Sequence, residues 1–598
     1  MKSCSRIRII PMCRLFAFCL LVSALMVDPV PVAAKSYLKV ALLKEPNNLN
    51  PFQTSDSWTK KVIRLIYQPL YLVDQDNQAL IPWLAEDQPV YDPENKTVTF
   101  HLRKMRWDDG TEFTADDVVF TAKIFKKFQI PRYYAYWKIV EKVEAPDKKT
   151  VRMTLEKPTA VFSRRSLTSF VVQKKKWEPF VKRAAKALGS PGVSQSEGDD
   201  RNTPREEGLK KGLEMIQRHP INQPTGLGPF KFASRKKGSY ILLVRNENFF
   251  GRGKTISGKT LGPYIDGVMF KIYGTLPDAT LALEEGQIDF LWKGVSQAFV
   301  RDLVPNPDIA VPMTLDQGYR YLGFNLRRFP MSERAFRQAA AYLINKGTIV
   351  KRILHDHAQR LDSFVPPSNT FYYDSNTPAY GKGMDRKRRT REAYSILNAQ
   401  GFRWQIPPIT AEGGLQKGEG LTGPDGREIP RLSLITPPAQ YDTEMAAAGK
   451  LILEWLTAFG LPVSWEDMPF GTLLRRVKVR RDFDMFIMGW KNLSLDPDYL
   501  RRFFHATYDA PNQWNFTGYD NAEFNRLADL QTATLNLKKR REIVFRMQQL
   551  LTQDLPYVPL YIPHQMEGIR TDRFDGWVKE AGGVGNIWTF CLLKPVHK

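Results

Sequence analysis

Cysteine is scarce in this chain of 598 residues, which has four cysteines in all. Cys4, Cys13 and Cys19 lie close to the N-terminus, so Cys591 is the only cysteine in the rest of the chain. A single thiol forms neither an internal disulfide nor a cysteine-based metal site. A protein without such crosslinks depends on a large hydrophobic core, which a chain of this length can supply.

Motifs of hydrolytic and metal-dependent active sites are also missing. The sequence contains neither G-x-S-x-G nor H-E-x-x-H. His355 and His357 are the one close pair among seven histidines, and no convincing third ligand lies near them in the sequence. We therefore expect no metal, no cofactor and no enzymatic activity.

Long apolar runs are confined to the N-terminus. Leu15 to Val27 form an apolar run after several basic residues, and Val32-Ala33-Ala34 supplies the small residues of a cleavage site. This order predicts a secretory signal peptide over residues 1–34, cleaved near Ala34. An uncleaved anchor is the alternative, although the run is short for a hydrocarbon core of about 30 Å. We expect a soluble periplasmic protein.

Acidic residues are fewer than basic residues, and the formal net charge is +24. The basic residues are scattered, for example at 174–176, 386–389 and 475–481, and no aromatic residues are interleaved with them as in a nucleic-acid groove. Nucleic acid is therefore not an expected partner. An anionic ligand, adhesion to an anionic envelope surface and a merely solvated basic surface remain open.

Short strand and helix patterns alternate along the chain and predict an α/β protein. Residues 37–43 (YLKVALL) alternate as a strand, and Thr114 is placed to cap a helix that follows a turn at Asp109-Gly110. An amphipathic helix is expected over Met445 to Phe459. Residues 186–222 are polar and rich in glycine, and we expect an exposed, partly mobile insertion there.

The segment from Gly253 to Thr260 matches the phosphate-loop pattern G-x-x-x-x-G-K-[ST]. A phosphate loop must lead into a helix, whose first N–H groups bind the phosphates. Here Leu261-Gly262-Pro263 follows, and it cannot propagate a helix. We therefore do not expect nucleotide binding.

Five longer segments carry specific motifs. They are EPNNLNPF (45–52), VTFHLRKMRWDDGTEFTADDVVFT (98–121), TGLGPFKF (225–232), ALEEGQIDF (282–290) and YLGFNLRRFPMSERAFRQAAAYLINK (321–346). In this order they resemble family 5 of the extracellular solute-binding proteins, the peptide- and nickel-type receptors of ABC importers. The resemblance extends over nearly all of residues 36–595, apart from the insertion.

The resemblance implies an α/β fold of two lobes, a class II-like periplasmic-binding-protein clamshell with an extra subdomain on the first lobe. Lobe I would comprise 35–69, 169–312 and 560–598, the subdomain 70–168, and lobe II 313–559. Hinge crossings are expected near 310–316 and 555–562. A monomer would hold a small-molecule or peptide-like solute between the lobes and present it to an ABC permease complex at the inner membrane.

The segment WKNLSLDP (490–497) is similar to the family pattern W-x-x-D-x-x-D-P. In the peptide-binding branch the first Asp pairs with the α-amino group of the peptide, and here Leu493 takes its place. Asp496 and Pro497 instead suit the N-cap and first position of a helix. Losing a charge-assisted hydrogen bond of about 1.5–3 kcal/mol would weaken binding of free-amine peptides roughly 10- to 100-fold.

The resemblance thus implies a receptor for a peptide-like or modified solute, which the basic balance suggests is anionic. The candidate ligand contacts are Trp490, Asn492 and Leu493 at the turn, Tyr321 and Asn325 near the first crossing, and Ser57 with Trp58 near the N-terminus. Each of these side chains could instead serve packing or capping. Other hypotheses are an ordinary oligopeptide receptor with a different amine anchor, a basic envelope- or nucleic-acid-binding protein, and a periplasmic enzyme on the same scaffold.

Overall fold

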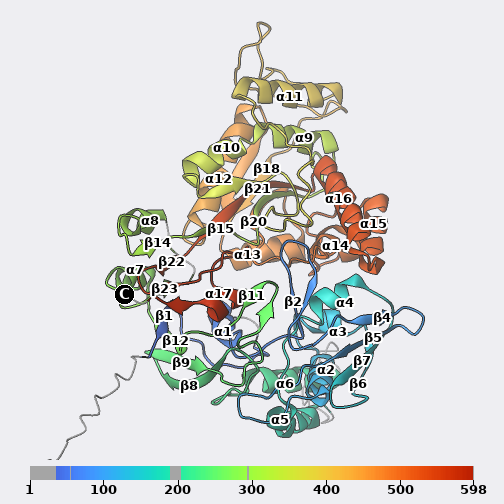
Figure 1. The fold of residues 1–598 in the computed structure, drawn as a ribbon. Coiled ribbons are helices and arrows are strands. Elements are labelled where there is room, and N and C mark those ends of the chain that lie inside the picture. The colour runs from blue at the N-terminus through green and yellow to red at the C-terminus, as the bar shows by residue number, and fades with distance from the viewer. Residues whose placement is uncertain (1–34, 54–55, 189–203, 293–294, 296, 597–598) are drawn as a thin grey trace, which may run out of the picture. The chain divides into compact units, whose positions relative to one another are not determined.

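The computed structural model of the protein describes residues 35–53, 56–188, 204–292, 295 and 297–596 (Figure 1). The expected signal peptide and residues 189–203 of the expected insertion lie outside this description. No helix among the described residues is both long and apolar enough to cross a membrane.

One seven-stranded sheet gathers strands from the beginning, middle and end of the chain, in the order β14-β22-β13-β1-β12-β9-β8. At its centre β1 (Tyr37–Leu42) runs parallel to β12 (Gly267–Ile272). Leu38 and Val40 on β1 are fully buried, as the alternating pattern predicts. The other strands are β8 (Phe230–Lys236), β9 (Tyr240–Arg245), β13 (Phe290–Leu291), β14 (Ile309–Ala310) and β22 (Gly568–Arg570). This sheet is the framework of lobe I, together with α1 (Ser57–Ile63), α7 (Leu276–Glu284), α8 (Gln297–Leu303) and α17 (Ile587–Leu592).

A second seven-stranded sheet is built from residues 313–566 and forms lobe II. In β16 (Arg320–Phe324) all five residues are buried, because hydrophobic side chains pack on both faces. Leu322 joins one hydrophobic cluster, and Tyr321 joins the cluster on the opposite face. The other strands are β15 (Met313–Leu315), β17 (Ala358–Arg360), β18 (Leu432–Thr436), β19 (Val463–Asp467), β20 (Met485–Gly489) and β21 (Tyr557–Met566). The main helices are α9 (Arg334–Leu343), α11 (Arg386–Ala399), α12 (Thr443–Ala458), α14 (Tyr499–Phe504), α15 (Ala522–Ala533) and α16 (Leu537–Asp554).

The chain passes between the two sheets twice. It leaves the first sheet after β14 ends at Ala310 and enters the second at Met313, inside the range 310–316 expected for the first crossing. It returns at Glu567, between β21 and β22, and not in the expected range 555–562. Residues 560–566 therefore belong to the sheet of lobe II, because they continue the hydrogen-bonded pairing of β21 with β15 and β17.

A four-stranded sheet, β4-β5-β7-β6, lies within the range 70–168 expected for the extra subdomain. Its helix α2 (Ala115–Lys127) begins as predicted, with Thr114 as N-cap and a capping box in which Asp117 accepts from the Thr114 N–H at 3.0 Å. The preceding turn has Gly110 at φ 85°, which favours glycine. The strands are β4 (Val90–Asp92), β5 (Thr97–His101), β6 (Val140–Glu144) and β7 (Thr150–Leu155), followed by α4 (Ala160–Arg165).

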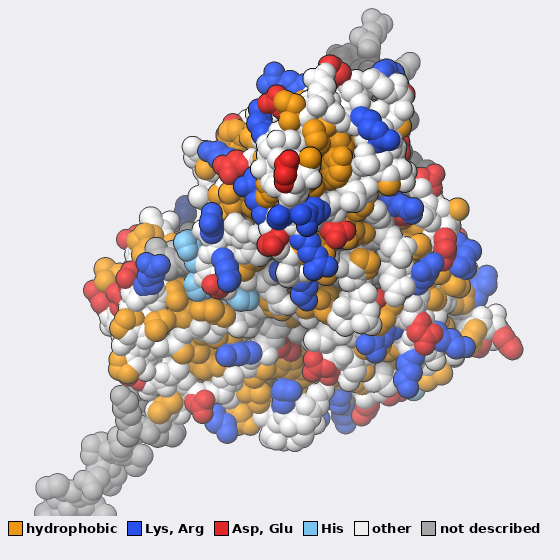
Figure 2. Space-filling model, turned by 90° about the horizontal axis from the view of Figure 1, so that it is seen from above, with side chains coloured by type: hydrophobic (Ala, Val, Ile, Leu, Met, Phe, Trp, Pro, Cys, Tyr) orange, Lys and Arg blue, Asp and Glu red, His pale blue; other side chains and the backbone are white. Residues whose placement is uncertain are grey.

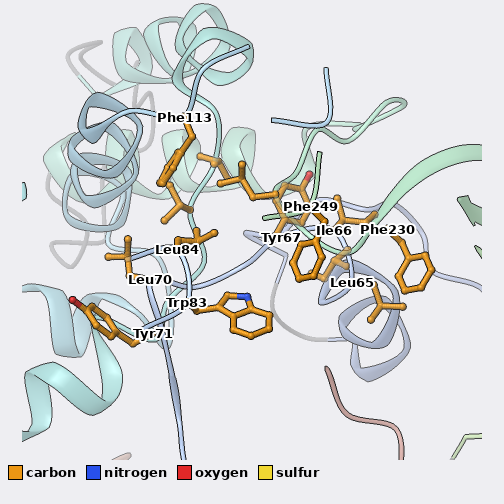
Figure 3. Packing of buried hydrophobic residues seen from close by; sticks show 14 of the residues in the cluster. Leu65, Ile66, Tyr67, Leu70, Tyr71, Trp83, Leu84, Phe113, Phe230 and Phe249 are labelled. Atoms are coloured by element: carbon orange, nitrogen blue, oxygen red, sulfur yellow. The ribbon is translucent and has the colours of Figure 1, made fainter. Parts of the chain in front are cut away.

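The core of lobe I continues into the subdomain without a break. Figure 3 shows Leu65, Tyr67 and Trp83 packed among the side chains of one cluster, which also includes Phe113 and Phe230. Trp83 is fully buried, and its indole N–H donates to Gln68 at 2.8 Å, so the polar group is satisfied inside the core. The subdomain is thereby fixed to lobe I by packing.

The expected insertion 186–222 is partly helical, which corrects the sequence-based prediction. Residues Pro204–Arg218 form α6, which packs against α5 (Lys174–Ala187). Gly208 and Gly212 are buried one turn apart, and a Cβ on Gly208 would lie 3.0 Å from the carbonyl oxygen of Ala187. The prediction from composition was wrong because glycine, which usually indicates a loop, here permits close contact between two helices.

The segment that matches the phosphate-loop pattern folds as a two-stranded hairpin. Strand β10 (Thr255–Ile256) pairs with β11 (Lys259–Thr260), and Gly258 lies in the turn with φ 74°. The segment therefore lacks the helix start that a phosphate loop needs.

Candidate ligand cleft

The turn after β20 is held against the beginning of β16. The Trp490 N–H donates to the Tyr319 carbonyl at 2.9 Å, and the Leu493 N–H donates to the Gln317 carbonyl at 2.8 Å. Gly318 permits this approach, since a Cβ there would lie 2.0 Å from the Trp490 carbonyl oxygen. The turn is thus fixed close to the first crossing, as expected for a part of the cleft.

Trp490 lies in an aromatic stack and not in open space. Its ring stacks on Phe503 at a centroid distance of 3.9 Å and on Tyr321 at 5.8 Å. Tyr321 is fully buried and stacks in turn on Tyr557 at 4.0 Å. These contacts give Trp490 and Tyr321 a packing role.

Leu493 is half-buried and packs against the same hydrophobic cluster of lobe II. Asn492 beside it is exposed and has φ 53°, a left-handed conformation that asparagine tolerates better than most residues. Asn492 therefore has a structural reason to occupy the turn. The ligand contacts expected from Asn492 and Leu493 stay predictions.

The Asp496 carboxylate accepts from the Asp498 N–H at 2.9 Å, which is the hydrogen bond expected of a capping residue, although the regular helix begins later. The helix α14 begins at Tyr499, and its N-cap position is Asp498. The Asp496 carboxylate also accepts two hydrogen bonds from Arg540, at 2.7 and 2.9 Å, and both side chains are almost completely buried. The carboxylate therefore serves both the helix start and a tertiary ion pair. Although burial raises the pKa of Asp496, the Arg540 guanidinium outweighs it and holds the pKa below its ordinary value.

Asn325 is buried, and its side-chain amide is fully engaged within lobe II. Its Nδ2 donates to the carbonyls of Phe483 at 2.9 Å and Arg481 at 3.2 Å, while its Oδ1 accepts from Arg327 at 3.1 Å. These bonds connect β16 to the start of β20. Asn325 therefore has no donor left for a ligand.

Among the described residues, two cavities that include Val73 lie between lobe I, with its subdomain, and lobe II. The hinge cavity, of about 450 Å³, is lined by the loop after β2 (Tyr71–Val73), by β15 and by residues 578–581 and Trp588. The seam cavity, of about 250 Å³, is lined by β2 and the end of α4 on one side and by Ser494, Leu495 and Asp496 on the other. The turn after β20 therefore borders the seam cavity through residues 494–496, and Leu493 does not line either cavity.

The two cavities differ in charge. The hinge cavity has acidic side chains at Asp74, Asp76 and Glu580 beside Lys259 and Lys579. Burial raises the pKa of Glu580, although the nearby cations act in the opposite direction. In the seam cavity the cations are Arg164 and Arg165, and its one carboxylate, Asp496, is already paired.

Ser57 and Trp58 lie at the start of α1 and line neither cavity. The Asp56 carboxylate caps this helix by accepting from the backbone N–H groups of Trp58 and Thr59. The Trp58 ring packs on the core of lobe I, with the ammonium of Lys61 5.1 Å from its centroid. Their expected ligand contacts stay predictions.

Sequence comparison identifies the protein family. The profile of the bacterial extracellular solute-binding proteins, family 5 (middle region), matches residues 79–511. The chain belongs to this family. This family 5 protein is 24% identical over 537 residues to the oligopeptide-binding protein AppA of Bacillus subtilis, a match that covers 88% of this chain and 86% of AppA.

Solved structures of similar fold agree with this assignment. NikZ from Campylobacter jejuni, in complex with Ni(L-His), matches with a TM-score of 0.64 and 22% identity over 92% of this chain and 97% of NikZ. HbpA2 from Haemophilus parasuis matches with a TM-score of 0.72 and 17% identity over 94% of this chain and the whole of HbpA2. The two-lobe α/β clamshell expected from the motifs is thereby confirmed.

Several charged residues of the family 5 protein's cleft were not predicted from the sequence. Arg164 and Arg165 end a six-residue helix, and no motif or spacing sets this pair apart from the many other basic residues. Glu580 likewise lies in an irregular segment without a recognisable pattern. Their importance comes from their position at the cavities, which depends on the tertiary fold.

Proposed function

We propose that the protein is a periplasmic receptor that captures a peptide-like solute lacking a free α-amino group and delivers it to the permease of an ABC importer. The observation that carries this proposal is the lack of an available carboxylate in the turn after β20. Leu493 occupies the position of the amine anchor, and the neighbouring carboxylates Asp496 and Asp498 are bound by Arg540 and Arg501. A free ammonium group would find no available carboxylate there.

Solutes other than plain peptides are compatible with the fold. NikZ holds Ni(L-His) on the same architecture, and the relative AppA is named for oligopeptides. The architecture therefore does not fix the solute class, and the side chains that line the cleft must decide it.

The test compares matched peptides. A set of tripeptides with free amines and the same tripeptides with N-acetyl groups would be titrated into the full mature chain by calorimetry, and any co-purified solute would be identified by mass spectrometry. We expect the two sets to bind within a few-fold of each other. A preference of 10-fold or more for the free amines would contradict the proposal, because it would require a carboxylate anchor.

An ordinary oligopeptide receptor is the second candidate, and the acidic side of the hinge cavity favours it. Asp76 and Glu580 line that cavity and form no ion pair with a described cation, so either could receive an ammonium group. In that case Glu580→Gln or Asp76→Asn would weaken binding of free-amine tripeptides by 10-fold or more. The same variants would leave binding of the N-acetyl peptides unchanged.

A further inference from the structure

Two arginines from different lobes donate to one hydroxyl. Arg165 Nη2, at the end of α4, and Arg502 Nη1, on α14, each lie 2.9 Å from the Tyr136 hydroxyl oxygen. Figure 1 shows α14 of lobe II beside the helices α3 (Tyr134–Trp137) and α4 of the subdomain. The two donor nitrogens are therefore separated by at most two hydrogen-bond lengths, and like charges this close repel each other.

Arg164 adds a third cation next to this pair. It lines the seam cavity together with Arg165, and its Nη1 is buried without a hydrogen-bond partner among the described residues. Burial lowers the pKa of Arg164 and outweighs the nearby Asp496 carboxylate, which acts in the opposite direction. We call Arg164, Arg165, Arg502 and Tyr136 the arginine cluster.

The carboxylates around the arginine cluster already have partners. Asp498 accepts from Arg501 at 2.8 and 3.1 Å, and Asp529 lies 3.4 Å from His505. Within the described part of the chain, none of the three arginines forms an ion pair with a carboxylate. The nearby Asp496 carboxylate acts electrostatically on Arg164 and Arg165, but it is already bound by Arg540 and forms no ion pair with the cluster.

The cluster is both ordered and accessible. The guanidinium carbon of Arg165 lies 4.3 Å from the ring centroid of Tyr136, a stacking contact that fixes the plane of its donors. Arg164 and Arg165 open onto the seam cavity, and Tyr136 and Arg502 open onto a neighbouring cavity of about 340 Å³. Either cavity has room for a small oxyanion.

We propose that the arginine cluster binds an oxyanion of the captured solute, a carboxylate or a phosphoryl group, and that this group holds the two lobes together. The proposal rests on the proposed function and names the class of solute. A planar guanidinium binds such oxygens with two parallel hydrogen bonds. Since Arg165 and Arg502 belong to different lobes, an oxyanion between them replaces their repulsion by attraction and favours the closed form.

The first experiment measures the thermal stability of the full mature chain with two kinds of probe. One is inorganic phosphate at constant ionic strength, with NaCl as the balancing salt. The other is a matched pair, an N-acetyl tripeptide with a free carboxylate and the same tripeptide as its C-terminal amide. We expect phosphate or the carboxylate form to raise Tm, and the amide to bind at least 10-fold more weakly than the carboxylate. Stronger stabilisation by phosphate than by the carboxylate would assign the site to phosphoryl groups, and the reverse to carboxylates.

The second experiment removes the donors. Arg165→Gln and Arg502→Gln should each weaken anion-dependent stabilisation by 10-fold or more. Arg165→Lys should have an intermediate effect, because lysine keeps the positive charge but lacks the two parallel N–H donors of the guanidinium group. Arg526→Gln is the matched control, since Arg526 is exposed on α15 of lobe II. Small-angle scattering should show that the anion compacts the wild-type chain and leaves the Arg165→Gln/Arg502→Gln variant unchanged.

The two proposals can fail separately. Equal anion-dependent stabilisation of the wild type and the double variant, or no effect of either anion beyond NaCl, overturns the role of the arginine cluster. If an uncharged solute co-purifies and binds both proteins equally, the receptor function stands and only the cluster proposal is lost. If no peptide probe binds and no solute co-purifies, the proposed function is lost as well.

Discussion

Arginines lie on two sides of the turn after β20, and they differ in their surroundings. Arg540 is completely buried, and its guanidinium is satisfied by Asp496 and Gln531. Arg165 and Arg502 are half-buried, border cavities and share a hydroxyl instead of a carboxylate. The difference indicates two roles. A buried ion pair whose donors are all hydrogen-bonded stabilises the fold, whereas cations without a carboxylate partner beside a cavity are available to a ligand.

The same comparison helps to interpret the excess of basic over acidic residues in the sequence. Figure 2 shows Lys and Arg side chains spread over one face of the molecule and mixed with Asp and Glu, without a continuous basic groove on that face. The net charge alone therefore did not locate a binding site. The local arrangement at Tyr136 is more informative, because two guanidinium groups from different lobes converge on one hydroxyl there without an ion pair to a described carboxylate.

The largest expected effect comes from breaking the buried pair. Arg540→Met leaves the Asp496 carboxylate buried without a counterion and should lower the free energy of unfolding by about 3–5 kcal/mol, measured by urea denaturation. The control is the double variant Asp496→Leu/Arg540→Met, which should recover most of this loss. A single variant as stable as the wild type would show that the pair does not fix the turn.

A smaller loss is expected from the aromatic packing of the turn. Phe503→Leu removes the ring that stacks on Trp490 at 3.9 Å and should lower the free energy of unfolding by about 1–2 kcal/mol. Tryptophan fluorescence should change as well, since the indole loses its neighbour. If instead peptide binding were abolished with no loss of stability, Trp490 would be a ligand contact and not a packing residue.

Acid should weaken the buried pair of Asp496 and Arg540. The folded-state pKa of Asp496 lies below its ordinary value of about 4, so the unfolded chain binds the proton more readily in this range. The stability that the pair contributes is therefore present above about pH 4 and is lost as the pH falls through the folded-state pKa. Between pH 5 and 3, the free energy of unfolding should fall more steeply for the wild type than for Asp496→Leu/Arg540→Met. Parallel curves would contradict this assignment.

The smallest effect on stability is expected at the arginine cluster. Arg502→Gln removes a half-buried cation that has no carboxylate partner, so the free energy of unfolding should change by less than about 1 kcal/mol in NaCl. A loss above about 2 kcal/mol would mean that Arg502 contributes to the fold in the same way as Arg540. Urea denaturation of Arg502→Gln beside Arg526→Gln decides between the two.

Local structure was predictable wherever short-range patterns were strong. Alternation identified β1, and Thr114 was correctly placed as a helix cap. The prediction failed for α6, where glycines mark helix contact, and for the second crossing, which lies at Glu567. Both failures concern contacts between distant segments, which local patterns do not reveal.

The candidate site was less predictable than the fold. Tyr321 and Asn325 were expected to contact the ligand near the first crossing, but one is stacked in the core and the other has its amide bonded to backbone carbonyls. A side chain's residue type does not reveal whether its polar groups already have partners. That depends on neighbours that the fold brings from elsewhere in the chain.

The sequence alone determined the family and the α/β class, because these are properties of residue order. The replacement of an amine anchor by Leu493 stays a prediction from the same resemblance. The tertiary structure alone decided which charges are neutralised. Asp496 pairs with Arg540 of α16, and Arg165 and Arg502 from different lobes both donate to the Tyr136 hydroxyl. Electrostatic energy depends on distance and burial, and the fold sets both.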